Sequence, residues 1–80
     1  MNGTYGTYER TERETAYAVV RHAYALLHEA RDAHRVACES KNRDAIATAT
    51  HAYLDAFATA RHARDAYNAA AQREREARDA

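Results

Sequence analysis

Proline and tryptophan are absent from this 80-residue chain, and glycine occurs only at Gly3 and Gly6. Nothing therefore supplies the turns that a β-sheet requires, and no run of strongly β-forming residues is present. The sequence predicts an all-α fold. No apolar stretch approaches the roughly 20 residues that span a bilayer, and the N-terminus lacks the layout of a signal peptide. We therefore expect no membrane segment and a cytoplasmic location.

Neither sign of charge is in excess, because twelve basic residues balance twelve acidic ones. This balance argues against the strong positive field that draws many proteins to nucleic acid. Lys41 is the only lysine among the twelve bases, the others being arginine. Together with the abundant alanine, this bias is typical of GC-rich genomes such as those of some bacteria and their phages. A phage-encoded protein acting in a bacterial host cell is one interpretation.

Large apolar side chains are also scarce, because most of the 46% apolar content is alanine. They are Val19, Val20, Leu26, Leu27, Val36, Ile46, Leu54 and Phe57. Two alanine-lined helices bury too little apolar surface to offset the entropy lost when they become ordered. The sequence therefore predicts self-association, as a homodimer or a higher species, with a four-helix bundle as the expected form.

Residues 1–8 repeat Gly-Thr-Tyr without helical periodicity and are expected to form a flexible arm. A first helix is expected at about 9–39, a turn at about 40–44, a second helix at about 44–75 and a frayed tail at 76–80. Thr11 and Glu14 fit a capping box, with a start near Thr7 as the alternative. Asn42 tolerates the left-handed conformation that ends a helix, and Asn42 or Asp44 could cap the next helix. One continuous helix is the alternative, because no glycine or proline enforces a break.

An alanine recurs at every seventh position in both halves of the chain. The series are Ala16, Ala23, Ala30 and Ala37, then Ala49, Ala56, Ala63 and Ala70. They mirror each other about Arg43, which predicts an antiparallel hairpin with an alanine seam and closely spaced axes. The pattern resembles the alanine-coil class of antiparallel helix pairs, a packing type that implies no activity. The alternative is that an alanine-rich composition produces the repeat by chance. Ala18 and Ala25 are expected on the outer face.

One side of each predicted helix carries arginine and aromatic residues at three- and four-residue spacing. The first row is Tyr17, Arg21, Tyr24, His28, Arg31 and Arg35, and the second is Tyr53, Phe57, Arg61, Arg64 and Asn68. Both residue types are enriched at protein interfaces. We expect a non-enzymatic interaction or regulatory module whose partners are itself, mainly through these rows, and another protein. The alternative is a small nucleic-acid-binding protein, because the same residues suit phosphates and base stacking.

The five histidines suggest metal binding, since His28 and Asp32 lie one helical turn apart, as do His51 and Asp55. However, the Glu-x-x-His string of carboxylate-bridged bundles is missing, so we expect surface histidines and no metal or cofactor. At about 100° per residue, Val19, Val20, Leu26 and Leu27 fall on an apolar stripe of the first helix, and Ile46, Tyr53 and Phe57 fall on one of the second. His34 falls on the first stripe and is expected to be a hydrogen-bonded histidine in the core or at an interface.

The single cysteine, Cys38, is expected to be a small buried hydrophobe, with an intersubunit disulfide or a reactive thiol as alternatives. No nucleophile has a general base at a recognisable spacing, and no phosphate-binding loop is present. We expect no catalytic residues and no enzyme activity.

Overall fold

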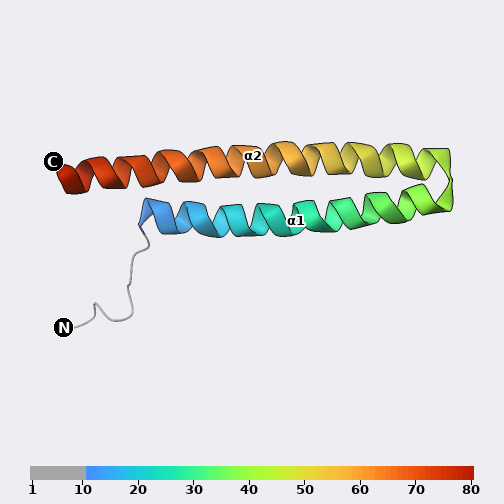
Figure 1. The fold of residues 1–80 in the computed structure, drawn as a ribbon, viewed down its shortest axis with the longest axis horizontal. Coiled ribbons are helices and arrows are strands. Elements are labelled where there is room, and N and C mark those ends of the chain that lie inside the picture. Colours follow the sequence, from blue (N-terminus) through green and yellow to red (C-terminus); the bar gives the residue numbers. More distant parts are fainter. Residues whose placement is uncertain (1–10) are drawn as a thin grey trace, which may run out of the picture.

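The computed structural model describes residues 11–80 and is an antiparallel helical hairpin (Figure 1). Its two helices, α1 (Glu12–Ser40) and α2 (Arg43–Asp79), lie side by side along their length. No strand occurs between residues 11 and 80, so the all-α prediction is confirmed for that part of the chain. The arm predicted at residues 1–8 lies outside the described residues.

Helix α1 begins with the predicted capping box. The Thr11 hydroxyl accepts a hydrogen bond from the Glu14 backbone N–H at 3.1 Å, and the Glu14 carboxylate accepts one from the Thr11 N–H at 2.9 Å. These bonds satisfy two backbone donors that have no partner within the helix. The helix consequently begins at Glu12 and not near residue 9.

Lys41 and Asn42 form the turn between the helices. The sequence predicts that Asn42 could either end α1 in a left-handed conformation or cap α2, and the structure gives the first role to Lys41 and the second to Asn42. Lys41 adopts the left-handed conformation, with φ 59° and ψ 20°, and its N–H bonds to the Cys38 carbonyl at 3.2 Å. Asn42 is extended and its side-chain oxygen accepts from the Ala45 N–H at 3.0 Å. The N-cap is therefore Asn42, and the left-handed residue is the one before it.

Helix α2 continues to Asp79, past the predicted end at 75 and through most of the tail that was expected to fray. Side-chain pairs hold the end of α2. Arg73 bonds to Glu12 of α1 at 2.6 Å, and Arg13 of α1 bonds to Glu74 at 3.1 Å. We call this pair of contacts the clasp. It joins α2 to the first turn of α1, close to the point where the second helix was expected to end.

Alanines form the core of the hairpin. Among the described residues the buried hydrophobic side chains are Ala23, Ala37, Ala60, Ala63 and Ala70, none more than 9% exposed. Ala23, Ala60 and Ala63 form one cluster, against which Val20, Tyr24 and Leu27 pack while partly buried. The helices therefore meet along small side chains.

The predicted seam alanines are all at least half-buried. Ala23, Ala37, Ala63 and Ala70 are buried, and Ala16, Ala30, Ala49 and Ala56 are half-buried. Ala25 is exposed, as expected for the outer face, but Ala18 is half-buried and was assigned to that face wrongly.

Large apolar side chains are mostly left at the edges of the contact between the helices. Val19 is 53% exposed, Leu26 42% and Phe57 48%, although the apolar stripes place all three on the inward faces. Their exposure has a simple cause, because a single partner helix is too narrow to cover a stripe of this width.

Candidate interaction surface

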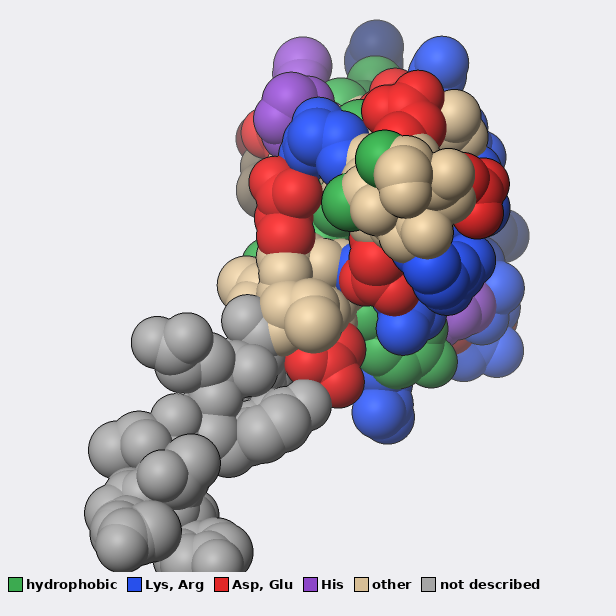
Figure 2. Space-filling model, turned by 90° about the vertical axis from the view of Figure 1, so that its left-hand side faces the viewer, with side chains coloured by type: hydrophobic (Ala, Val, Ile, Leu, Met, Phe, Trp, Pro, Cys, Tyr) green, Lys and Arg blue, Asp and Glu red, His purple; other side chains and the backbone are tan. Residues whose placement is uncertain are grey.

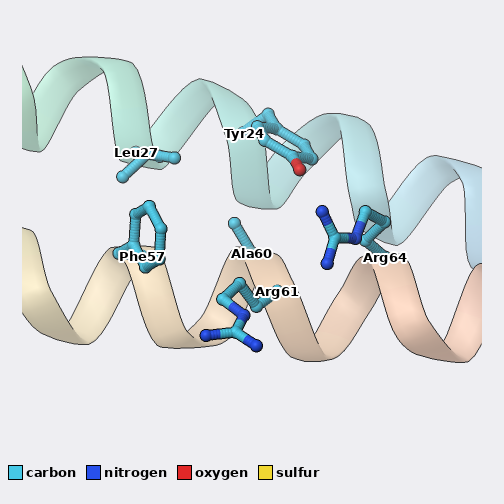
Figure 3. Close-up of a pocket in the computed structure, with 6 residues that line it drawn as sticks. All are labelled: Tyr24, Leu27, Phe57, Ala60, Arg61 and Arg64. Atoms are coloured by element: carbon cyan, nitrogen blue, oxygen red, sulfur yellow. The ribbon is translucent and has the colours of Figure 1, made fainter.

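The hairpin brings Tyr24 of the first arginine–aromatic row together with Phe57, Arg61 and Arg64 of the second. Tyr24 and Leu27 of α1 and Phe57, Ala60, Arg61 and Arg64 of α2 line an open hollow of about 370 Å³ (Figure 3). In the close-up, Phe57 points toward Leu27, and Arg64 extends into the space beside Tyr24 (Figure 3). The hollow lies between the helices, so each helix supplies only part of it.

A second hollow, of about 260 Å³, adjoins the first through Phe57 and is lined by Tyr53, Leu54 and Phe57. Its walls are almost entirely apolar. Leu54 is 59% exposed and Phe57 48%, so this part of the surface offers apolar contact directly to solvent. Leu54 is not a member of the predicted row. Its spacing of three from Phe57 and seven from Arg61 is the signal that would have placed it there.

The arginines of this surface have few ionic partners among the residues that the structure describes. Arg64 lies 3.7 Å from Asp65, and Arg31 lies 3.9 Å from Asp32, each pair being exposed and adjacent in sequence. Within residues 11–80, Arg61 makes no ion pair. Exposed pairs of this kind contribute little to stability. These guanidinium groups therefore remain available to a partner.

The rest of the first row extends along α1 outside both hollows. Tyr17 lies near the open end and packs against Tyr67 with ring centroids 5.8 Å apart. Arg21, His28, Arg31 and Arg35 are exposed. In the end-on view, Lys and Arg side chains are numerous along the right-hand side of the molecule, and others lie at its top, at its bottom and toward the left (Figure 2).

Arg13, Arg75 and Arg78 line a further hollow of about 280 Å³ beside Tyr67 and Glu74. The pKa of Arg13 is raised by its hydrogen bonds to Glu74 and Tyr67 and by the nearby carboxylate charge. Arg13 is thus engaged within the chain, in contrast to Arg61.

His34 forms a polar contact across the helix pair. Its Nε2 lies 3.1 Å from the Thr50 hydroxyl, and its ring lies 5.7 Å from that of Tyr53. The predicted hydrogen bond of His34 is confirmed, and it joins α1 to α2 within the chain. Cys38 is exposed, with its Sγ 3.8 Å from His34 Nε2, so the expectation of a buried cysteine is wrong.

In residues 11–80 no group of three or more His, Cys, Asp or Glu side chains converges as a metal site would require. The same residues include no helix with the length and apolar character needed to cross a membrane.

Comparison with known proteins gives no relative. No protein-family model matches the chain, and neither a curated protein nor a solved structure matches it. The surface described above is therefore the basis on which function is inferred.

Proposed function

We propose that this chain is a small non-enzymatic interaction module that self-associates into a four-helix bundle and acts through protein–protein contacts. The observation that carries the proposal is the mismatch between its core and its surface. The buried hydrophobic side chains are alanines, whereas Tyr17, Val19, Leu26, Leu54 and Phe57 are each 42 to 59% exposed. Apolar burial is the main favourable term in folding, and a second copy would supply the burial that one hairpin lacks.

The side of the hairpin around Val19 and Leu26 is the best candidate for the contact between copies. These residues are seven positions apart. At about 100° per residue they lie on one side of Ala23 around the helix axis, and Tyr17 and Tyr24 lie on the other side. The same periodicity places the exposed residues Ala33, Ala52, Thr59 and Ala66 on this flank. Small uncharged side chains allow close approach of two helix pairs.

The arginine–aromatic side is less suited to a symmetric dimer than the sequence suggested. Most soluble homodimers use the same patch on both copies. If the two-fold axis passed near Arg61 and Arg64, these arginines of one copy would lie close to those of the other, and like charges at an interface are costly. We therefore propose that Tyr24, Phe57, Arg61 and Arg64, which line one hollow, contact a different partner.

Within each hairpin, we propose that the heptad alanines form the seam. The clasp pairs Glu12 with Arg73 and Arg13 with Glu74, which places the mirror point of the hairpin at Arg43 to within one residue. That register sets Ala23 opposite Ala63, and both belong to the buried cluster.

Sedimentation equilibrium on the full chain and on two variants tests self-association. We expect the wild type to be a dimer or larger, with a melting temperature that rises with protein concentration. Leu26→Glu should shift the protein toward monomer and lower its helix content at micromolar concentration. Val36→Glu is the matched control, because Val36 is 58% exposed and lies on the side of α1 that faces away from α2. A wild-type monomer that melts independently of concentration would contradict the proposal.

A nucleic-acid binder remains the second candidate, and the hollow that combines Tyr24 and Phe57 with Arg61 and Arg64 favours it. Aromatic rings stack on bases and guanidinium groups bind phosphates. A gel shift with single-stranded and duplex oligonucleotides, repeated at increasing salt, would reveal such binding through its steep salt dependence.

A further inference from the structure

We propose that the two adjoining hollows bind an acidic amphipathic helix of another protein. The docking groove is formed by Tyr24, Tyr53, Leu54, Phe57, Arg61 and Arg64. The inference rests on the proposed function in one respect, that the chain is an interaction module. It adds the surface used and the chemistry of the partner.

The apolar end of the docking groove calls for an aliphatic anchor. The hollow of about 260 Å³ is walled by Tyr53, Leu54 and Phe57 and has almost no polar lining. Leu54 and Phe57 are 59% and 48% exposed, so they gain apolar burial when a side chain enters. A leucine or isoleucine side chain supplies that contact, whereas a nucleic acid has no aliphatic side chain to offer.

The other end of the docking groove calls for carboxylates. Arg61 and Arg64 follow Phe57 by one and two helical turns, so the positive charge lies on the same side of α2 as the apolar hollow. Guanidinium groups bind carboxylates through paired, charge-assisted hydrogen bonds. A helix with its apolar anchor one or two turns from Glu or Asp residues matches both ends at once.

The charges around the docking groove favour a protein over a nucleic acid. Asp65 lies 3.7 Å from Arg64, and Asp32 lies 3.9 Å from Arg31. Carboxylates in these places repel a continuous phosphate backbone but leave room for single carboxylates on a helix. The net charge of the whole chain is zero, so no long-range field attracts a polyanion.

The test measures binding by fluorescence anisotropy between the full-length chain and a labelled helical peptide. The probe is about 20 residues long, or roughly 30 Å as a helix, with leucines on one face and glutamates flanking them. A second peptide replaces every glutamate by glutamine. A single-stranded oligonucleotide of similar length serves as the nucleic-acid probe.

Two variants alter the two ends of the docking groove separately. Leu54→Ala removes apolar contact, with Val36→Ala as the control because Val36 is equally exposed, at 58%. The double change Arg61→Glu and Arg64→Glu reverses the charge, with Arg43→Glu as the control at the far end of the hairpin. Circular dichroism verifies that each variant stays helical, and Leu54→Ala keeps the test decisive if the double variant unfolds.

We expect the glutamate peptide to bind, and both groove variants to weaken binding at least about tenfold while the controls do not, since hot-spot residues dominate such contacts. The glutamine peptide should bind the wild type at least about tenfold more weakly. No binding of the glutamate peptide, equal loss in the controls, or tighter binding of the oligonucleotide would overturn the proposal. Sedimentation of the same samples separates the two proposals. A dimer that does not bind the peptide contradicts only the docking proposal. A monomer that binds the peptide contradicts only self-association.

Discussion

At the scale of single residues, the turn is the place where the chain departs from the conformations its side chains prefer. Lys41 has φ 59°, and within residues 11–80 it is the only residue with positive φ. A residue with a Cβ atom pays roughly 1–2 kcal/mol for this left-handed conformation, whereas glycine adopts it freely. Because Asn42 caps α2 with its side chain, the residue before it has to end α1.

Lys41→Gly is therefore expected to stabilise the protein by up to about 1 kcal/mol, the relief of strain exceeding the added entropy of the unfolded chain. Chemical denaturation measures the change at fixed protein concentration. Glu39→Gly is the control, because it places glycine in an exposed helical position and should cost about 1 kcal/mol. Equal losses in both variants would show that the lysine is not strained at the turn.

At the scale of the helices, the alanine spacing and the exposure of the flanking side chains have one explanation. Small side chains let two helix axes approach closely, and closely packed helices leave larger residues at the margins of the contact. Val19 and Phe57 lie at such margins, about half exposed. The buried hydrophobic side chains between the helices are thus small, and larger apolar side chains lie partly exposed beside them.

Replacing Ala30 or Ala56 by Leu tests this packing. Both residues are half-buried. A larger side chain there should force the helix axes apart and lower the free energy of unfolding by about 1–3 kcal/mol. Ala25→Leu and Ala58→Leu are the controls, because both alanines are exposed, and these should change stability by no more than about 0.5 kcal/mol. Leucine has nearly the helix propensity of alanine. Denaturation curves that show equal effects at all four sites would refute the alanine seam.

At the scale of the whole molecule, the clasp closes the open end of the hairpin. Glu12 with Arg73 and Arg13 with Glu74 join residues that are 61 positions apart in the sequence. Hydrogen bonding to Arg73 lowers the pKa of Glu12, and the hydrogen bond to Glu12 raises the pKa of Arg73. The two ends of the chain's helical part are therefore coupled through ionised groups.

The clasp predicts how stability depends on pH. A carboxyl whose pKa is lower in the folded protein stabilises the fold above its ordinary pKa of 4.5 and loses that contribution as pH falls through the folded value. Titration of Glu12 by NMR should give a pKa below 4.5, and Arg73→Gln should return it toward that value. Arg75→Gln is the control, since Arg75 bonds to Gln72 and not to Glu12. An unchanged Glu12 pKa in Arg73→Gln would show that the clasp does not form in solution.

Much of the local structure could be predicted from the chain alone, because it depends on neighbours in sequence. The capping box at Thr11 and Glu14, the break near Arg43 and the helical class all follow from interactions within a few residues. The two arginine–aromatic rows are likewise visible as periodic patterns on each helix.

The relation between the helices could not be predicted in the same way. Periodicity gives the angle of a side chain about its own helix axis, but not the rotation of one helix against the other. Only the packed pair places Tyr24 beside Phe57 and Arg64 in one hollow, leaves Leu26 and Phe57 about half exposed, and joins Glu12 to Arg73. These features depend on contacts between residues far apart in sequence, because the packing of α1 against α2 determines which larger side chains remain uncovered and which charges meet.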